Sequence, residues 1–117
     1  MELSQAIIDN VGVLIVSGQI DAYSAPEVEK ALNPLIDAHQ GKVVVDFTAV
    51  DYVSSAGLRI MLAGLKRARS LKDAADQAGD LCVVGLQPQV KEVFDIAGFT
   101  PLFKIYDAAA AAANSFG

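Results

Sequence analysis

Three short apolar runs constrain the fold of this chain more than any other feature of its sequence. They occupy residues 13–18, 42–47 and 81–86. The first opens as a continuous apolar stretch, which is typical of a strand buried on both faces of a sheet. The segments between the runs carry apolar residues at helical spacing. This alternation of strands and helices predicts an α/β domain.

The two ends of the chain add strands to this pattern. Residues 5–9 alternate weakly, and the turn signal Asn10-Val11-Gly12 follows them. Together with the run at 13–18 they predict an antiparallel N-terminal hairpin, which makes the sheet mixed. Residues 102–106 predict a last short strand. The sequence therefore favours one domain, residues 1–117, with a mixed sheet of four to five strands.

Helix signals lie between the predicted strands. Ser24 and Glu27 form a capping-box pattern before a helix that should kink or break near Pro34. Further helices are predicted over residues 55–70 and 88–98. Asp107 is expected to cap a helix in the alanine-rich tail, and residues 73–80 are expected to form a flexible connection.

Charge and composition exclude several classes of function. The formal net charge is −5 and the sequence pI is near 4.6, which argues against nucleic acid because phosphate binding needs a basic stripe. No stretch reaches the roughly 20 apolar residues of a membrane helix, so no membrane insertion is expected. The single Cys82 and the absence of a signal peptide favour a reducing, cytoplasmic setting. The basic cluster at residues 65–72 is read as a solvated helix face, with a contact patch for an acidic partner as the alternative.

The sequence argues against an enzyme. His39, the one histidine, lies in a polar connection and is expected to be a solvated surface residue. Nucleophile-elbow and phosphate-loop motifs are absent, and one cysteine with one histidine excludes the common zinc sites. Asp21, Asp46 and Asp51 could converge at one end of the sheet, but we favour roles at turns and strand ends. We therefore expect no catalytic residue, no metal and no cofactor.

Two adjacent serines, Ser54 and Ser55, stand where the predicted third strand leads into the helix over 55–70. One of them is explained as an N-cap, whose oxygen accepts a hydrogen bond from a first-turn amide. Capping explains neither the second serine nor Gly57. Glycine costs roughly 1 kcal/mol against alanine inside a helix, so its presence indicates a close approach to the backbone.

A phosphate on the second serine would suit this position. Free amides and the helix dipole favour an anion at a helix N-terminus. The modification would add about −1.5 to −2 charges to the surface, and Arg59 lies one turn after Ser55. The pattern predicts a switch that alters a docking surface while leaving the fold intact.

Three motifs in order resemble the STAS domain, and within it the small bacterial anti-sigma factor antagonists. The first is Gly18-Gln19-Ile20-Asp21. The second is VVVDFTAVDYVSSAGLRIML, residues 43–62, and the third is VKEVFDIAGF, residues 90–99. The resemblance covers essentially the whole chain. It implies a small mixed sheet with helices packed mainly on one face.

The resemblance also implies a function in transcription regulation. Such antagonists bind an anti-sigma factor that is usually a serine protein kinase, and thereby release a sigma factor. The kinase phosphorylates a serine at the strand-helix turn, which ends the complex, and a phosphatase resets it. Counting back from Gly57-Leu58, that serine matches Ser55. The family's usual preceding acid is replaced by Ser54, which becomes the lesser candidate. The implied partner surface comprises Asp21, Ser54, Ser55, Ala56, Gly57 and Arg59.

Two alternatives use the same end of the sheet. One is a constitutive STAS docking module of a stressosome or transporter complex, without a phosphate cycle. The other is a small-ligand or nucleotide-binding domain that uses Asp21 and Ser55.

Overall fold

The N-terminal hairpin predicted from the sequence is the first element of the fold. In a computed structural model that describes residues 1–116, β1 (Glu2–Ile8) pairs antiparallel with β2 (Val11–Ile20). Asp9 and Asn10 form the two-residue turn, with φ of 49° and 68°, as the hairpin turns that match strand twist require. The turn falls earlier than the predicted Asn10-Val11-Gly12 signal, because Gly12 already lies in β2.

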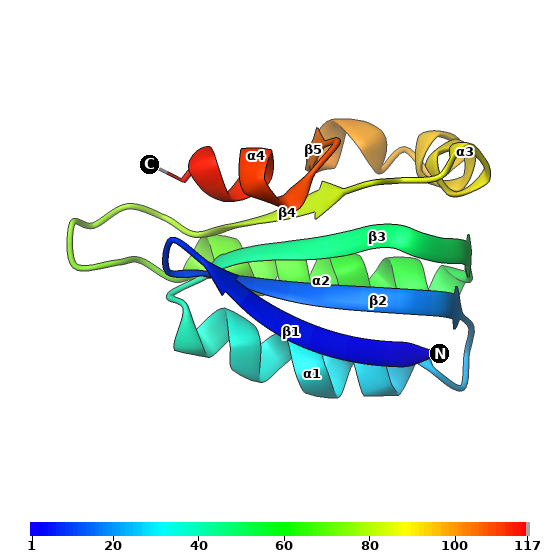
Figure 1. The fold of residues 1–117 in the computed structure, drawn as a ribbon, viewed down its shortest axis with the longest axis horizontal. Coiled ribbons are helices and arrows are strands. Elements are labelled where there is room, and N and C mark those ends of the chain that lie inside the picture. The colour runs from blue at the N-terminus through cyan, green and yellow to red at the C-terminus, as the bar shows by residue number, and fades with distance from the viewer. Residues whose placement is uncertain (117) are drawn as a thin grey trace.

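The sheet is mixed and has five strands, as predicted. β3 (Lys42–Val53), β4 (Asp80–Val84) and β5 (Lys104–Tyr106) run parallel to β2, in the order β1-β2-β3-β4-β5 (Figure 1). β3 does not end at Phe47 as expected. It continues to Val53 because β2 pairs with it as far as Ile20, through two register shifts. β5 starts later than predicted, since Thr100–Leu102 form a short 3-10 helix.

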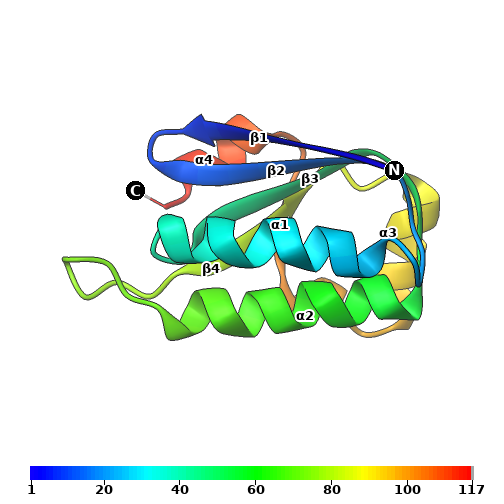
Figure 2. The same ribbon diagram turned by 90° about the horizontal axis from the view of Figure 1, so that it is seen from below.

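The helices divide unequally between the two faces of the sheet. α1 (Ala25–Ala38), α2 (Ser55–Ser70) and α3 (Pro88–Ile96) pack on one face, and the short α4 (Ala109–Asn114) packs on the other (Figure 2). The expectation of helices mainly on one face is confirmed. No helix within residues 1–116 combines the length and apolar composition needed to cross a membrane.

Alternation along the strands builds two apolar layers. Leu14, Val45 and Phe47 point into the larger layer, beneath α1, α2 and α3, where Phe47 meets Phe94 edge to face at 5.9 Å. Val44 and Cys82, on the opposite side of the same strands, pack against α4 in the smaller layer. Strands buried on both faces explain why their sequences read as continuous apolar runs.

The structure corrects two local predictions, at Pro34 and Asp107, and adds detail to the connection over residues 73–80. α1 runs unbroken through Pro34, because burial of the helix's apolar face outweighs one lost backbone hydrogen bond. Asp107 does not cap α4, whose N-cap is Ala108 without a side-chain hydrogen bond. The connection over residues 73–80 contains a turn in which Asp73 Oδ1 accepts hydrogen bonds from the amides of Ala75 and Gln77.

Candidate functional site

Asp21 directly follows β2 and organises the turn into α1. Its Oδ1 accepts hydrogen bonds from the amides of Tyr23 and Ser24, both at 2.9 Å. The Ser24 hydroxyl oxygen accepts a hydrogen bond from the Asp21 amide at 2.9 Å. The predicted capping box is therefore wrong, since Ser24 turns back toward Asp21 and makes no side-chain cap of α1. The hydrogen bonds from Ser24, its backbone N–H first, hold the pKa of Asp21 below its usual value.

Ser54 is the serine that caps α2. It has extended backbone angles, and its Oγ accepts a hydrogen bond from the Gly57 amide at 3.2 Å. Its own amide donates to the Ile20 carbonyl at 2.8 Å. Since Ile20 immediately precedes Asp21, the structure brings the ends of β2 and β3 together at this junction. Asp21 and Ser54 thus occupy neighbouring positions at the same end of the sheet, where the carboxyl ends of β2 and β3 meet.

Ser55 is the first residue of α2 and is exposed. Its side chain makes no hydrogen bond within residues 1–116, and the amides of Ser55 and Ala56 have no partner there. The first turn of α2 contains no acidic residue. No carboxylate in the first turn therefore neutralises the positive end of the helix dipole. This favours binding of an anion at Ser55.

Gly57 is buried, and its close surroundings belong to this chain. A Cβ at this position would lie 2.8 Å from Cγ2 of both Ile20 and Val53. The close approach inferred from the sequence therefore exists, between α2 and the ends of β2 and β3. Ala56 is half-buried against the same apolar layer, whereas Arg59 is exposed on α2.

An acidic depression of about 580 Å³ adjoins this junction. Asp21, Tyr23, Glu27 and Asp51 contribute to its lining. Two of the three aspartates weighed from the sequence meet here, but Asp46 does not line the depression. Asp46 lies within β3, where its Oδ1 accepts a hydrogen bond from the Thr48 amide at 2.9 Å.

Two exposed tyrosines accompany the serines, and sequence reasoning did not single them out as site residues. Tyr23 is 92% exposed in the turn after Asp21, and Tyr52 is 48% exposed just before Val53 and Ser54. Exposed aromatic side chains are enriched at protein contact surfaces. Sequence periodicity could not identify Tyr23, because it lies in a turn, where side chains do not follow the spacing of a helix or a strand.

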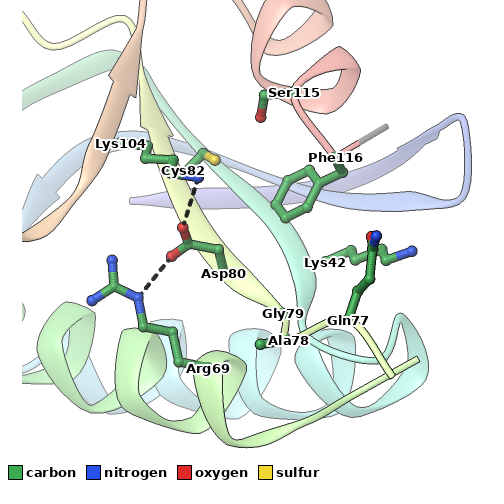
Figure 3. A pocket seen from close by; sticks show the side chains of 10 residues that line it. All are labelled: Lys42, Arg69, Gln77, Ala78, Gly79, Asp80, Cys82, Lys104, Ser115 and Phe116. Carbon is green, nitrogen blue, oxygen red and sulfur yellow. Dashed lines mark hydrogen bonds and ion pairs between the residues drawn. The ribbon is translucent and has the colours of Figure 1, made fainter. Parts of the chain in front are cut away.

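Both arginines of the basic cluster at residues 65–72 bind partners within the molecule. Arg67 forms a two-bond ion pair with Asp37, at 2.9 and 2.6 Å. Arg69 binds Asp80 at 3.1 Å and the Leu102 carbonyl at 2.9 Å. Arg69 and Asp80 line a cavity of about 410 Å³ at the amino ends of β3, β4 and β5, away from the serines (Figure 3).

His39 has a structural position. It is half-buried at the end of α1, and its Nδ1 lies 2.9 Å from the Asn10 carbonyl oxygen in the hairpin turn. It is therefore not the solvated loop residue expected from the sequence. Within residues 1–116, no three His, Cys, Asp or Glu side chains are grouped so that they could hold a metal ion.

Comparison with known proteins identifies the family. The STAS domain model matches residues 3–112. The chain belongs to the STAS domain family. A Bordetella bronchiseptica protein named as an anti-sigma factor antagonist, BtrV, is 34% identical over 116 residues, which cover 99% of this chain and 95% of BtrV. The resemblance carried by the three sequence motifs is confirmed.

Solved structures of STAS proteins share this fold. An anti-sigma factor antagonist from Mycobacterium paratuberculosis superposes with a TM-score of 0.82, at 25% identity over 97% of this chain and 92% of that one. The phosphorylated form of the Bacillus cell fate determinant SpoIIAA superposes with a TM-score of 0.67. That match has 17% identity and covers 98% of each chain. At this identity it shows the fold alone.

Proposed function

We propose that this STAS protein binds an anti-sigma factor that is also a serine kinase, and that phosphorylation of Ser55 ends the interaction. The observation that supports the proposal is that the two adjacent serines have different environments. Ser54 is occupied as the cap of α2, whereas Ser55 is exposed at the next position. A kinase can therefore reach the Ser55 hydroxyl without breaking the cap.

The names of related proteins support this proposal. BtrV and the Mycobacterium paratuberculosis protein are both named as anti-sigma factor antagonists. The unmodified protein would occupy the anti-sigma factor and so release the sigma factor. A phosphatase would return the modified protein to its binding form.

The geometry favours a switch that leaves the fold intact. A phosphate on Ser55 would lie at the positive end of α2, where two first-turn amides lack partners. Burying an unpaired phosphate in an interface fitted to a neutral serine costs several kcal/mol. A loss of about 3–4 kcal/mol corresponds to a roughly hundred- to thousandfold weaker complex.

We propose that the chain acts by binding and catalyses no reaction itself. The kinase would supply the base, the nucleotide and the metal for phosphoryl transfer. The contact surface would comprise Asp21, residues 54–56 and Arg59. Gly57, which the resemblance placed in this surface, is buried and would support the turn from within. The exposed Tyr23 would extend this surface, because a rigid aromatic side chain adds contact area at low entropic cost.

The test is phosphorylation by the candidate anti-sigma kinase with ATP and Mg²⁺, mapped by intact and peptide mass spectrometry. We expect one phosphate on Ser55, absent in Ser55→Ala and retained in Ser54→Ala. Ser70→Ala is the matched control, since Ser70 is an exposed serine at the other end of α2. Phosphate on Ser54 alone would overturn the assignment of Ser55.

Binding to the same kinase separates the remaining interpretations. The unmodified protein should bind, and the Ser55-phosphorylated protein should bind at least a hundredfold more weakly. Stable binding with no phosphorylation would instead indicate a constitutive docking module. Nucleotide binding by the isolated protein, measured by calorimetry, would favour the small-ligand alternative.

A further inference from the structure

We propose that β1 is a self-association edge, which pairs antiparallel with β1 of a second copy of this chain. The five-stranded sheet ends at β1, which pairs with β2 on one side alone. Figure 1 shows β1 as the outermost strand of the sheet. Five of its seven residues are exposed, and Leu3 and Ile8 are half-buried. The strand thus presents a free row of backbone groups.

This edge lacks the features that normally prevent strand pairing. Natural edge strands are short, bulged, or protected by proline or lysine. β1 has seven residues without proline or a basic side chain, and its register with β2 is continuous. The opposite edge of the sheet is protected, because β5 has three residues and carries the exposed Lys104. The difference points to β1 as the edge available to a partner.

The hairpin turn fixes which backbone groups face outward. In a two-residue hairpin the flanking pair, here Ile8 and Val11, exchanges both hydrogen bonds, and such pairs then alternate along the ladder. The even-numbered residues of β1 therefore direct their amides and carbonyls toward β2. Leu3, Gln5 and Ile7 direct theirs away from the sheet. These three residues would form the hydrogen bonds to a second copy.

One antiparallel register uses all three outward residues. It places Gln5 opposite Gln5 of the second copy, on a twofold axis. Leu3 then lies opposite Ile7 of the second copy on the same face, so that the half-buried Leu3 covers an isoleucine that is 68% exposed in the monomer. Glu2, the one charged residue of the strand, faces Ile8 of the second copy, so no like charges meet.

The partner is therefore this chain itself rather than an unrelated peptide. In the proposed register, Leu3 of one copy packs against Ile7 of the other. Each strand presents the side chains that the other strand needs, because the pairing is symmetric about Gln5. This association is independent of Ser55, which lies at the start of α2, and it needs no modification.

Sedimentation equilibrium and light scattering of the unmodified protein, residues 1–117, test the proposal. From low micromolar to near millimolar concentration, the mass should rise from 12.3 kDa toward twice that value. Ile7→Lys should weaken association at least tenfold, because it places a charge opposite Leu3. Ile96→Lys is the matched control, since Ile96 is 79% exposed on α3, and it should leave the mass unchanged.

Cross-linking tests the register. Gln5→Cys should give a covalent dimer with a short bismaleimide, whereas Ser4→Cys and Ala6→Cys should react less; the native Cys82 is buried and does not compete. A monomer at every concentration would overturn the proposal. So would a dimer that survives Ile7→Lys, or one that is lost in Ile96→Lys. Circular dichroism of both lysine variants would exclude unfolding as the cause.

Discussion

The amide of Ser54 donates a hydrogen bond to the Ile20 carbonyl at 2.8 Å, and this contact ties the start of α2 to the end of β2. It fixes the position of the next residue, Ser55, relative to the turn that begins at Asp21. The phosphoacceptor we propose is thus held by the end of strand β2 and by a helix cap. A site built on such elements is positioned more firmly than one on a free loop.

Removing the cap should destabilise the protein, and removing its neighbour should not. Ser54→Ala loses the acceptor for the Gly57 amide, so the free energy of unfolding should fall by about 1 kcal/mol. Ser55→Ala should change it by less than about 0.5 kcal/mol, because the side chain is exposed. Urea denaturation of both variants provides the measurement. Equal losses in the two variants would contradict the assignment of Ser54 as the cap.

Gly57→Ala should destabilise the protein although alanine is the better helix former. The added methyl would lie 2.8 Å from side-chain carbons of Ile20 and Val53, and overpacking of this kind costs about 1–3 kcal/mol. The control is Ala63→Gly at an exposed position of α2, which measures helix propensity without the core contact. A stabilised Gly57→Ala protein in thermal or urea unfolding would show that the junction has spare room.

The contribution of Asp21 to stability should depend on pH. Its pKa in the folded protein lies below the ordinary 3.8, chiefly because of hydrogen bonds from Ser24. A lowered folded pKa stabilises the protein above the unfolded value, and this stabilisation is lost as the pH falls through the folded pKa. The difference in unfolding free energy between the wild type and Asp21→Ala should therefore be largest near neutral pH and shrink in acid.

Urea denaturation at neutral and strongly acidic pH measures this difference for Asp21→Ala. Asp107→Ala, which removes an exposed carboxylate elsewhere on the chain, controls for the change in net charge. A difference for Asp21→Ala that stays constant across this range would mean that its carboxylate charge contributes nothing to the fold.

Cys82 should be unreactive in the folded protein. Burial raises the pKa of its thiol to about 11, so about one molecule in a thousand carries the reactive thiolate near pH 8. Alkylation with iodoacetamide, followed by mass spectrometry, should be slow in buffer and fast in concentrated urea. Rapid labelling in buffer would show that α4 opens readily from the sheet, since α4 covers this residue.

Much of the fold could be predicted because short stretches of the sequence show which residues belong to the core. Strands buried on both faces need continuous apolar runs. Helices that pack on a sheet need apolar residues every three or four positions. Residues 42–47 and 55–70 could therefore be recognised as a strand and a helix without tertiary information. The three motifs likewise carried the resemblance to the STAS family. The two serines marked the strand-helix junction, since few residue types cap a helix.

Tertiary structure alone decided the details of the site. Two neighbouring serines have the same chemistry, and the hydrogen bond to Gly57 is what distinguishes the cap, Ser54, from the exposed Ser55. The capping-box pattern at Ser24 failed because Asp21 offered a competing acceptor within the same turn. The extension of β3 to Val53 depends on pairing with β2, a partner distant in sequence. Local pattern indicates which elements form, whereas contacts between distant segments fix where each ends and which side chains remain exposed.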